Sequence, residues 1–206
     1  MNDPAKKTGY NPYSYWYDRA MDYRVSIDSG KEIEFLRKII QEFDLSGTDM
    51  LEVGSGHGRI FKALNRARLM DNSNIRLIDP DKFKMVDIVD PMRFKCFQNT
   101  GMLPDLWDGL VLPYSDGAFD LVISFSVMLH VPPADIEAHF KECCRVTKNH
   151  LYIATCRSSE KPLADHCFIH EYSNLIDDNN MAIVDFKIYS YSAGSMQRIN
   201  WLLKKI

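Results

Sequence analysis

Short apolar runs and amphipathic stretches alternate along most of the chain. The runs that predict strands lie at 50–53, 75–78, 119–124, 151–155, 183–191 and 197–203. The stretches with helical spacing of apolar residues lie at 33–43, 59–66, 132–144 and 172–179. Residues 81–107 are ambiguous, and either 95–98 or 106–107 could form a further strand. Strands that alternate with helices predict a doubly wound, mostly parallel α/β sheet whose strands end along a common edge.

The N-terminal stretch differs from the rest of the chain because it is rich in aromatic residues. Tyr13, Trp16 and Tyr17 all fall within residues 1–30, ahead of the first predicted core helix. We expect residues 1–30 to form a lid or cap and residues 31–206 to form one domain, since 206 residues suit a single core. Ordinary packing of an N-terminal helix explains the aromatic residues equally well.

Composition and charge narrow the functional classes. The net charge is −3, from 25 basic and 28 acidic residues, so the chain lacks the basic excess expected of a nucleic-acid binder. No apolar run approaches the length of a membrane span. The five cysteines form no C-x-x-C pair and are odd in number, which favours reduced thiols in a cytoplasmic protein.

A glycine-rich loop follows the first predicted strand, in the segment Leu51-Glu-Val-Gly-Ser-Gly-His-Gly58. Glycine lets the backbone turn sharply and lets a ligand approach without meeting a Cβ. The helix after Gly58 would offer unpaired N–H groups to a carboxylate or a phosphate. A tight structural turn is the simpler explanation of the glycines alone.

Two acidic residues sharpen this interpretation. Glu52 lies two residues before Gly54, and Asp79 follows the predicted strand 75–78. An acid after the second strand of such a sheet can accept hydrogen bonds from the ribose hydroxyls of an adenosine. Alternatively, Asp79 forms a turn ahead of Pro80.

These segments together resemble the class I methyltransferases that depend on S-adenosylmethionine (SAM), in particular their small single-domain members. The first match is the glycine loop with Glu52, where Asp is commoner, and the second is Asp79. The others are Asp108-Gly-Leu-Val-Leu-Pro-Tyr114, Asp116-Gly-Ala-Phe-Asp-Leu-Val122 and Arg145-Val-Thr-Lys-Asn-His-Leu-Tyr-Ile153. In the last of these, Asn149-His150 replaces the usual Gly-Gly turn. The resemblance implies a Rossmann-like, seven-stranded, mostly parallel sheet with an antiparallel C-terminal strand.

The resemblance also implies an enzyme with SAM as cofactor and S-adenosylhomocysteine (SAH) as product. The residues it places around SAM are Glu52, Gly54, Ser55, Gly56, Gly58, Asp79, Pro80, Asp108, Gly109, Leu110, Ser124 and Phe125. Separately, the aromatic N-terminal stretch could place Tyr17 over the cofactor as part of a lid. Asp79 would hold the ribose and Asp108 the adenine amino group, with Asn99 as the alternative if 95–98 is a strand. No metal is implied.

Methyl transfer requires an oriented acceptor and, for hydroxyl acceptors, removal of a proton. His130 follows the predicted strand 119–124 and is the candidate general base, although a structural histidine fits as well. We expect the acceptor to be the O or N of a small molecule, with neither nucleic acid nor membrane as partner. The alternatives are a nicotinamide-dependent oxidoreductase, which would favour G-x-G-x-x-G over the observed G-x-G-x-G, and a non-catalytic SAM-binding module.

Overall fold

A computed structural model describes residues 9–22, 30–65, 67–68, 74–158, 164, 166–191 and 196–206. Within these residues, seven strands form one sheet in the order β5-β4-β1-β6-β7-β9-β8. They are β1 (Met50–Val53), β4 (Phe83–Asp87), β5 (Asp105–Leu106), β6 (Phe119–Phe125), β7 (Thr147–Ser158), β8 (Met181–Tyr191) and β9 (Met196–Lys205). The pairs from β5 to β7 are parallel, and β9 runs antiparallel to both β7 and β8. The expected fold class is therefore confirmed.

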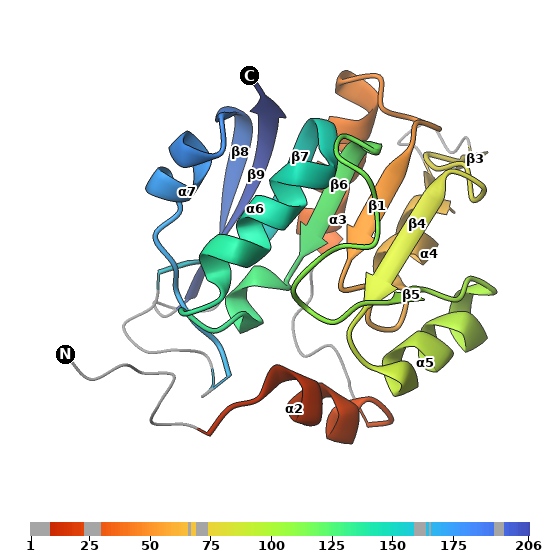
Figure 1. Ribbon diagram of the computed structural model, residues 1–206. Helices are drawn as coiled ribbons and strands as arrows, with labels where there is room; N and C mark the ends of the chain where they lie inside the picture. The colour runs from red at the N-terminus through yellow and green to blue at the C-terminus, as the bar shows by residue number, and fades with distance from the viewer. Residues whose placement is uncertain are drawn as a thin grey trace.

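Helices cover both faces of the sheet (Figure 1). They are α2 (Pro12–Arg19), α3 (Gly30–Glu42), α4 (Arg59–Asn65), α5 (Asp90–Thr100), α6 (Ile136–Val146) and α7 (Ser173–Asp178), with a 3-10 helix η1 (Met128–His130). Apolar side chains of α3, α4 and α5 pack on one face, and those of α6 and α7 pack on the other. Because the central strands are covered on both sides, β1 and β6 are almost uninterrupted apolar sequences. In the described part of the chain, no helix is long and apolar enough to cross a bilayer.

The prediction of a sheet strand at 75–78 is wrong. Only Asn74–Ile75 (β3) is extended, and it pairs with Ala67–Arg68 (β2) in a separate two-stranded sheet. Leu77 and Ile78 are buried, so their apolar character was correctly linked to the core. They nevertheless lie in a turn region, where the carbonyl of Leu77 accepts a hydrogen bond from Gly47. The parallel partners of β1 are β6 and β4, and β4 begins eight residues after Ile75.

The ambiguous region also resolves into a helix and a short strand. Residues 95–98 lie within α5, which begins with Pro at its first turn and ends at Gly101 in a left-handed conformation. Met92 and Cys96 face the core at helical spacing, whereas Phe94 and Phe97 are exposed. The alternative at 106–107 comes closer, since β5 ends at Leu106.

A buried ion pair joins the first turn of α3 to β9. Arg198 Nε donates to both carboxylate oxygens of Glu32 at 2.9 and 3.0 Å, and these side chains are 3% and 0% exposed. The same guanidinium donates to Ser126 Oγ at 2.7 Å. Ser126 follows β6 and has a φ of 62°, a left-handed conformation that is costly for a residue other than glycine. Arg198 therefore connects α3, β9 and the turn after β6.

We expect Arg198→Met to destabilise the protein by about 3–5 kcal/mol, because the change leaves the carboxylate of Glu32 buried without its cation. Lys38→Met is the matched control, because the Lys38–Glu42 pair is exposed on α3 and contributes only about 0.3–0.5 kcal/mol. Urea unfolding of both variants measures the difference. Equal losses in the two variants would contradict the importance assigned to the buried pair.

Candidate active site

The glycine loop connects β1 to α4 at the carboxyl edge of the sheet. Gly54, Gly56 and Gly58 all have positive φ angles, of 73°, 51° and 76°. A Cβ on Gly54 would lie 2.4 Å from Val127 Cγ2, and one on Gly58 would lie 2.4 Å from Thr100 Cγ2. A Cβ on Gly56 would meet nothing within 4 Å. Gly54 and Gly58 are thus required by packing, whereas Gly56 faces open space.

That space is a cavity at the ends of β1, β4 and β6. Its lining comprises Trp16, Glu52, Gly54, Ser55, Gly56, His57, Arg59, Ile60, Asp87, Ile88, Met92, Trp107, Phe125, Ser126, Val127 and His130. Most of the predicted loop residues are therefore brought together here. Gly58 is not part of this lining, because it packs closely against Thr100, where a Cβ would not fit.

Asp87 is the acid that sequence reasoning missed. It is the last residue of β4, and its Oδ2 accepts a hydrogen bond from the Gly56 N–H at 2.8 Å. The position after the strand that pairs with β1 is the one expected for a ribose-binding acid. The sequence signal that could have identified Asp87 is the segment Phe83-Lys-Met-Val-Asp87. It is an apolar strand that ends in an acid just ahead of a helix with Pro91 in its first turn.

Asp79 and Pro80 lie at the opposite edge of the sheet. They precede β4, and Lys82 accepts a hydrogen bond from Met50, the first residue of β1. The whole length of β4 separates Asp79 from the glycine loop. The roles predicted for Asp79 and Pro80 therefore do not fit the fold, because the strand that was expected to carry them to the carboxyl edge does not form.

Two carboxyl groups lie at the base of the cavity, and burial changes the acidity of both. Burial raises the pKa of Glu52 to about 8 and that of Asp87 to about 6. Nearby Arg59 opposes the shift at Glu52. Glu52 Oε2 is buried, with no hydrogen-bond partner among the described residues. In the ligand-free protein, Glu52 is therefore mostly protonated near pH 7.

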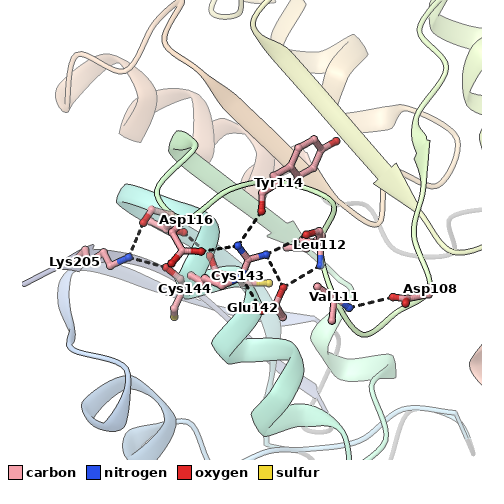
Figure 2. Close-up of polar contacts among 11 residues, drawn as sticks. Asp108, Val111, Leu112, Tyr114, Asp116, Glu142, Cys143, Cys144 and Lys205 are labelled. Atoms are coloured by element: carbon pink, nitrogen blue, oxygen red, sulfur yellow. Dashed lines mark hydrogen bonds and ion pairs between the residues drawn. The ribbon is translucent and has the colours of Figure 1, made fainter.

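A second cavity adjoins the first across Trp16, Ile88, Trp107, Val127 and His130. Its other lining residues are Asn11, Pro12, Tyr13, Asp108, Gly109, Leu110, Val131, Pro132, Asp135 and His139. Asp108 Oδ1 accepts a hydrogen bond from Val111 N at 3.0 Å (Figure 2) and another from Leu110 N at 2.8 Å, which shapes this turn. The predicted segment Asp108–Leu110 therefore lines the second cavity, which adjoins the cavity bordered by the glycine loop.

Arg145 on α6 holds the loop that carries this turn. Its guanidinium donates to the carbonyls of Leu112 and Tyr114 and to the carboxylate of Asp116, at 2.8 to 3.0 Å. Glu142 pairs with Arg145 at 2.8 Å and accepts a hydrogen bond from Leu112 N at 2.9 Å (Figure 2). The paired guanidinium lowers the pKa of Glu142. The loop is thereby fixed to α6.

Helix α2 lies across the carboxyl ends of the strands (Figure 1). Trp16 lines both cavities, and Tyr13 lines the second. Tyr17, the predicted cofactor contact, is 53% exposed and lines neither cavity. Residues one position apart on a helix face different directions, which is why Trp16 and not Tyr17 covers the site.

Hydrogen bonds hold the segment around α2 to three loops. Tyr10 Oη donates to the carbonyl of His130 at 3.1 Å, and Tyr15 Oη is 3.0 Å from Nε2 of His166. His57 Nε2 donates to the carbonyl of Ala20 at 3.0 Å. The loops after β1, β6 and β7 therefore all contact this segment.

The end of β6 forms one wall of the first cavity. Phe125 lines it, and the guanidinium of Arg59 lies 5.0 Å from the centre of the Phe125 ring. Ser124 is fully buried and is absent from the lining of both cavities. Ser124 was expected beside the ligand, but alternation along the strand places its neighbour Phe125 there instead.

His130 lies where both cavities meet, and its ring is held by its surroundings. Its Nδ1 donates to the carbonyl of His166 at 3.0 Å, and its ring packs against Trp16. Burial lowers the pKa of His130 to about 4. The ring is thus neutral at pH 7 but less basic than an efficient general base for that pH.

Glu52→Gln should remove a pH-dependent loss of stability. The folded pKa of Glu52 is about 8, above its ordinary value, so the native state holds a proton that the unfolded chain releases as the pH rises. Wild-type stability should therefore fall relative to the variant between about pH 5 and about pH 8.5. Urea unfolding of both proteins without ligand at each pH tests this. A stability difference that does not change with pH would contradict the assignment.

Comparison with known proteins places this site in a family. No curated protein sequence matches the chain. Among solved structures, it is similar to the magnesium protoporphyrin IX methyltransferase of Synechocystis with bound SAH (TM-score 0.68, 15% identity, 94% of this chain and 98% of that one). It is also similar to a SAM-dependent methyltransferase of Leishmania major (TM-score 0.67, 17% identity, 97% and 89%).

A model of the family described as "Methyltransferase domain" matches residues 51–154, just over half of the chain. The match begins at β1 and ends within β7, so it includes the glycine loop, Asp87, Asp108 and the end of β6. The chain therefore belongs to the class I SAM-dependent methyltransferase family.

Proposed function

We propose that this enzyme transfers the methyl group of SAM to an oxygen or nitrogen atom of a small molecule held beneath α2. The observation that carries the proposal is the open space in front of Gly56, bordered by Glu52 and Asp87. The residues present fit the cofactor. At Gly56 no Cβ separates the backbone from the first cavity. Two buried polar atoms that line the cavities, Glu52 Oε2 and Trp107 Nε1, have no hydrogen-bond partner in the described part of the chain.

Each of the two cavities suits a different part of SAM. In this proposal the methionyl group lies along Gly54–Gly56, and Asp87 accepts hydrogen bonds from the ribose hydroxyls. The adenine ring lies in the second cavity, between Ile88 and the turn at Asp108–Leu110. Asp87 takes the role first expected of Asp79, since it is the acid at the carboxyl edge.

The acceptor then occupies the first cavity near Phe125, below Trp16. SAM supplies an activated methyl group on a sulfonium, so the protein's main task is to orient the acceptor and exclude water. Trp16 and His130 form the apolar and polar parts of this enclosure, and their rings contact each other with centroids 4.9 Å apart. We assign His130 the role of orienting the acceptor, since its low pKa makes it a weak base on its own.

Asp87→Asn should weaken SAM binding at least about tenfold, because each lost charge-assisted hydrogen bond contributes about 1.5–3 kcal/mol before water compensates. The amide oxygen can still accept the Gly56 N–H, so the loop should persist. Asp79→Asn is the control and should leave affinity unchanged. Isothermal titration with SAM and SAH distinguishes them, and the reverse result would restore Asp79 as the ribose-binding acid.

Gly56→Val should abolish SAM binding, because the new side chain would enter the cavity. Gly47→Val is a matched control: Gly47 also has a positive φ, of 69°, and open space around it, but lies before β1 at the far edge of the sheet. Both variants carry similar backbone strain, so their unfolding temperatures should fall by similar amounts, while only Gly56→Val should lose SAM binding. SAM binding retained by Gly56→Val would show that the loop is only a turn.

The direct test of activity is transfer of radiolabel from methyl-labelled SAM to a panel of small hydroxyl and amine compounds, with SAH measured in parallel. Labelled product that disappears in Gly56→Val supports the proposal. SAM binding without transfer to any compound would favour a non-catalytic module. Binding of NAD in place of SAM would favour the oxidoreductase alternative.

A further inference from the structure

His130, His166 and Cys167 form a compact group beside the proposed acceptor position. His130 ends η1 after β6, and the other two lie on the segment between β7 and α7. One potential ligand atom from each residue lies within 4.8 Å of the others. Cys167 is buried and both histidines are partly buried. Imidazole nitrogen and thiolate sulfur are donors that zinc-like ions prefer, whereas magnesium and calcium prefer oxygen.

The spacing of the group matches a tetrahedral ion. His130 Nδ1 and Cys167 Sγ are 3.8 Å apart, and the centroids of the two stacked imidazole rings are 5.1 Å apart. For Zn–N and Zn–S bonds of about 2.0 and 2.3 Å, tetrahedral angles place N and S about 3.5 Å apart and the centroids of two coordinated imidazoles about 5.2 Å apart. The distances therefore suit the ion, and binding would require rotation of at least one stacked ring so that both rings point a nitrogen at it.

Neighbouring residues already orient both rings. Tyr15 Oη contacts Nε2 of His166 at 3.0 Å, which restrains the orientation of that ring. A hydrogen-bond partner on the second ring nitrogen is usual for metal-binding histidines. Trp16 packs edge-on against the His130 ring. On His130, an ion would replace the proton that Nδ1 now donates to the carbonyl of His166.

We propose that His130, His166 and Cys167 bind a zinc-class divalent ion whose fourth coordination position opens toward the cavity lined by His130. Three protein ligands with an open position are the composition of catalytic zinc sites, whereas structural sites are closed by four. Cys156 packs next to Cys167 but lies outside the group, so it serves as an internal control.

The site, taken with the proposed methyl transfer on which this step rests, defines a class of acceptor. A hydroxyl group in the cavity could bind at the open position, where the ion lowers its pKa and its proton passes to water. The inference therefore favours hydroxyl over amine acceptors.

Titration of the full-length, metal-free protein with Co²⁺ tests the site directly. Tetrahedral cobalt with a thiolate ligand should give intense visible bands and a near-ultraviolet sulfur-to-metal transition, both removed by added Zn²⁺. Cys167→Ser should abolish the sulfur transition, and His166→Gln should weaken binding at least about tenfold. Cys156→Ser should titrate like the wild type. Metal analysis after dialysis against Zn²⁺ gives an independent measure.

The proposal is overturned if the wild type shows no cobalt bands, or if Cys167→Ser retains the sulfur transition. SAH binding is measured on every variant, because the metal site and the cofactor site can fail separately. Cobalt bands in a wild type that does not bind SAH would leave the metal site standing and refute the proposed methyl transfer. SAH binding without cobalt bands would refute the metal site and leave the proposed methyl transfer standing.

Discussion

The buried contact of Arg198 with Glu32 and Ser126 is the constraint from which the site's geometry follows. Arg198 lies near the C-terminal end of the chain, on the antiparallel strand β9, and reaches both α3 and the turn after β6. Its hydrogen bond to Ser126 supports the left-handed backbone there. The next residue, Val127, is the one that leaves no room for a Cβ on Gly54. One buried cation thus links the last strand to the glycine loop.

The second constraint is the parallel arrangement of β4, β1 and β6. Parallel strands bring their carboxyl ends to one edge, so Asp87, the glycine loop and Phe125 meet although they are far apart in sequence. The hydrogen bond from Gly56 to Asp87 then fixes the loop against β4. The network of Arg145 does the same for the loop that carries Asp108. The two loops that border the cavities are therefore each fixed by hydrogen bonds to another element of the fold.

The sequence was sufficient to predict the class of fold and the glycine loop, because strand–helix alternation and positive-φ glycines are local signals. It was insufficient to choose which apolar segment pairs with β1. Ile75–Ile78 and Phe83–Asp87 both carry apolar side chains that become buried, and tertiary packing decides which of the two segments pairs with β1. The same limit applied to α2, where helical spacing could not show whether Trp16 or Tyr17 faces inward.

The position of α2 has a consequence for the pace of the reaction cycle. Trp16 borders both cavities, and Tyr10, Tyr15 and Ala20 tie its surroundings to the loops after β6, β7 and β1. In the binding mode proposed above, a molecule as large as SAH would have to pass this cover, so its dwell time would be coupled to the rupture of those hydrogen bonds. The contacts that exclude water during transfer are then the ones that delay departure, and a tighter enclosure would gain protection at the expense of turnover.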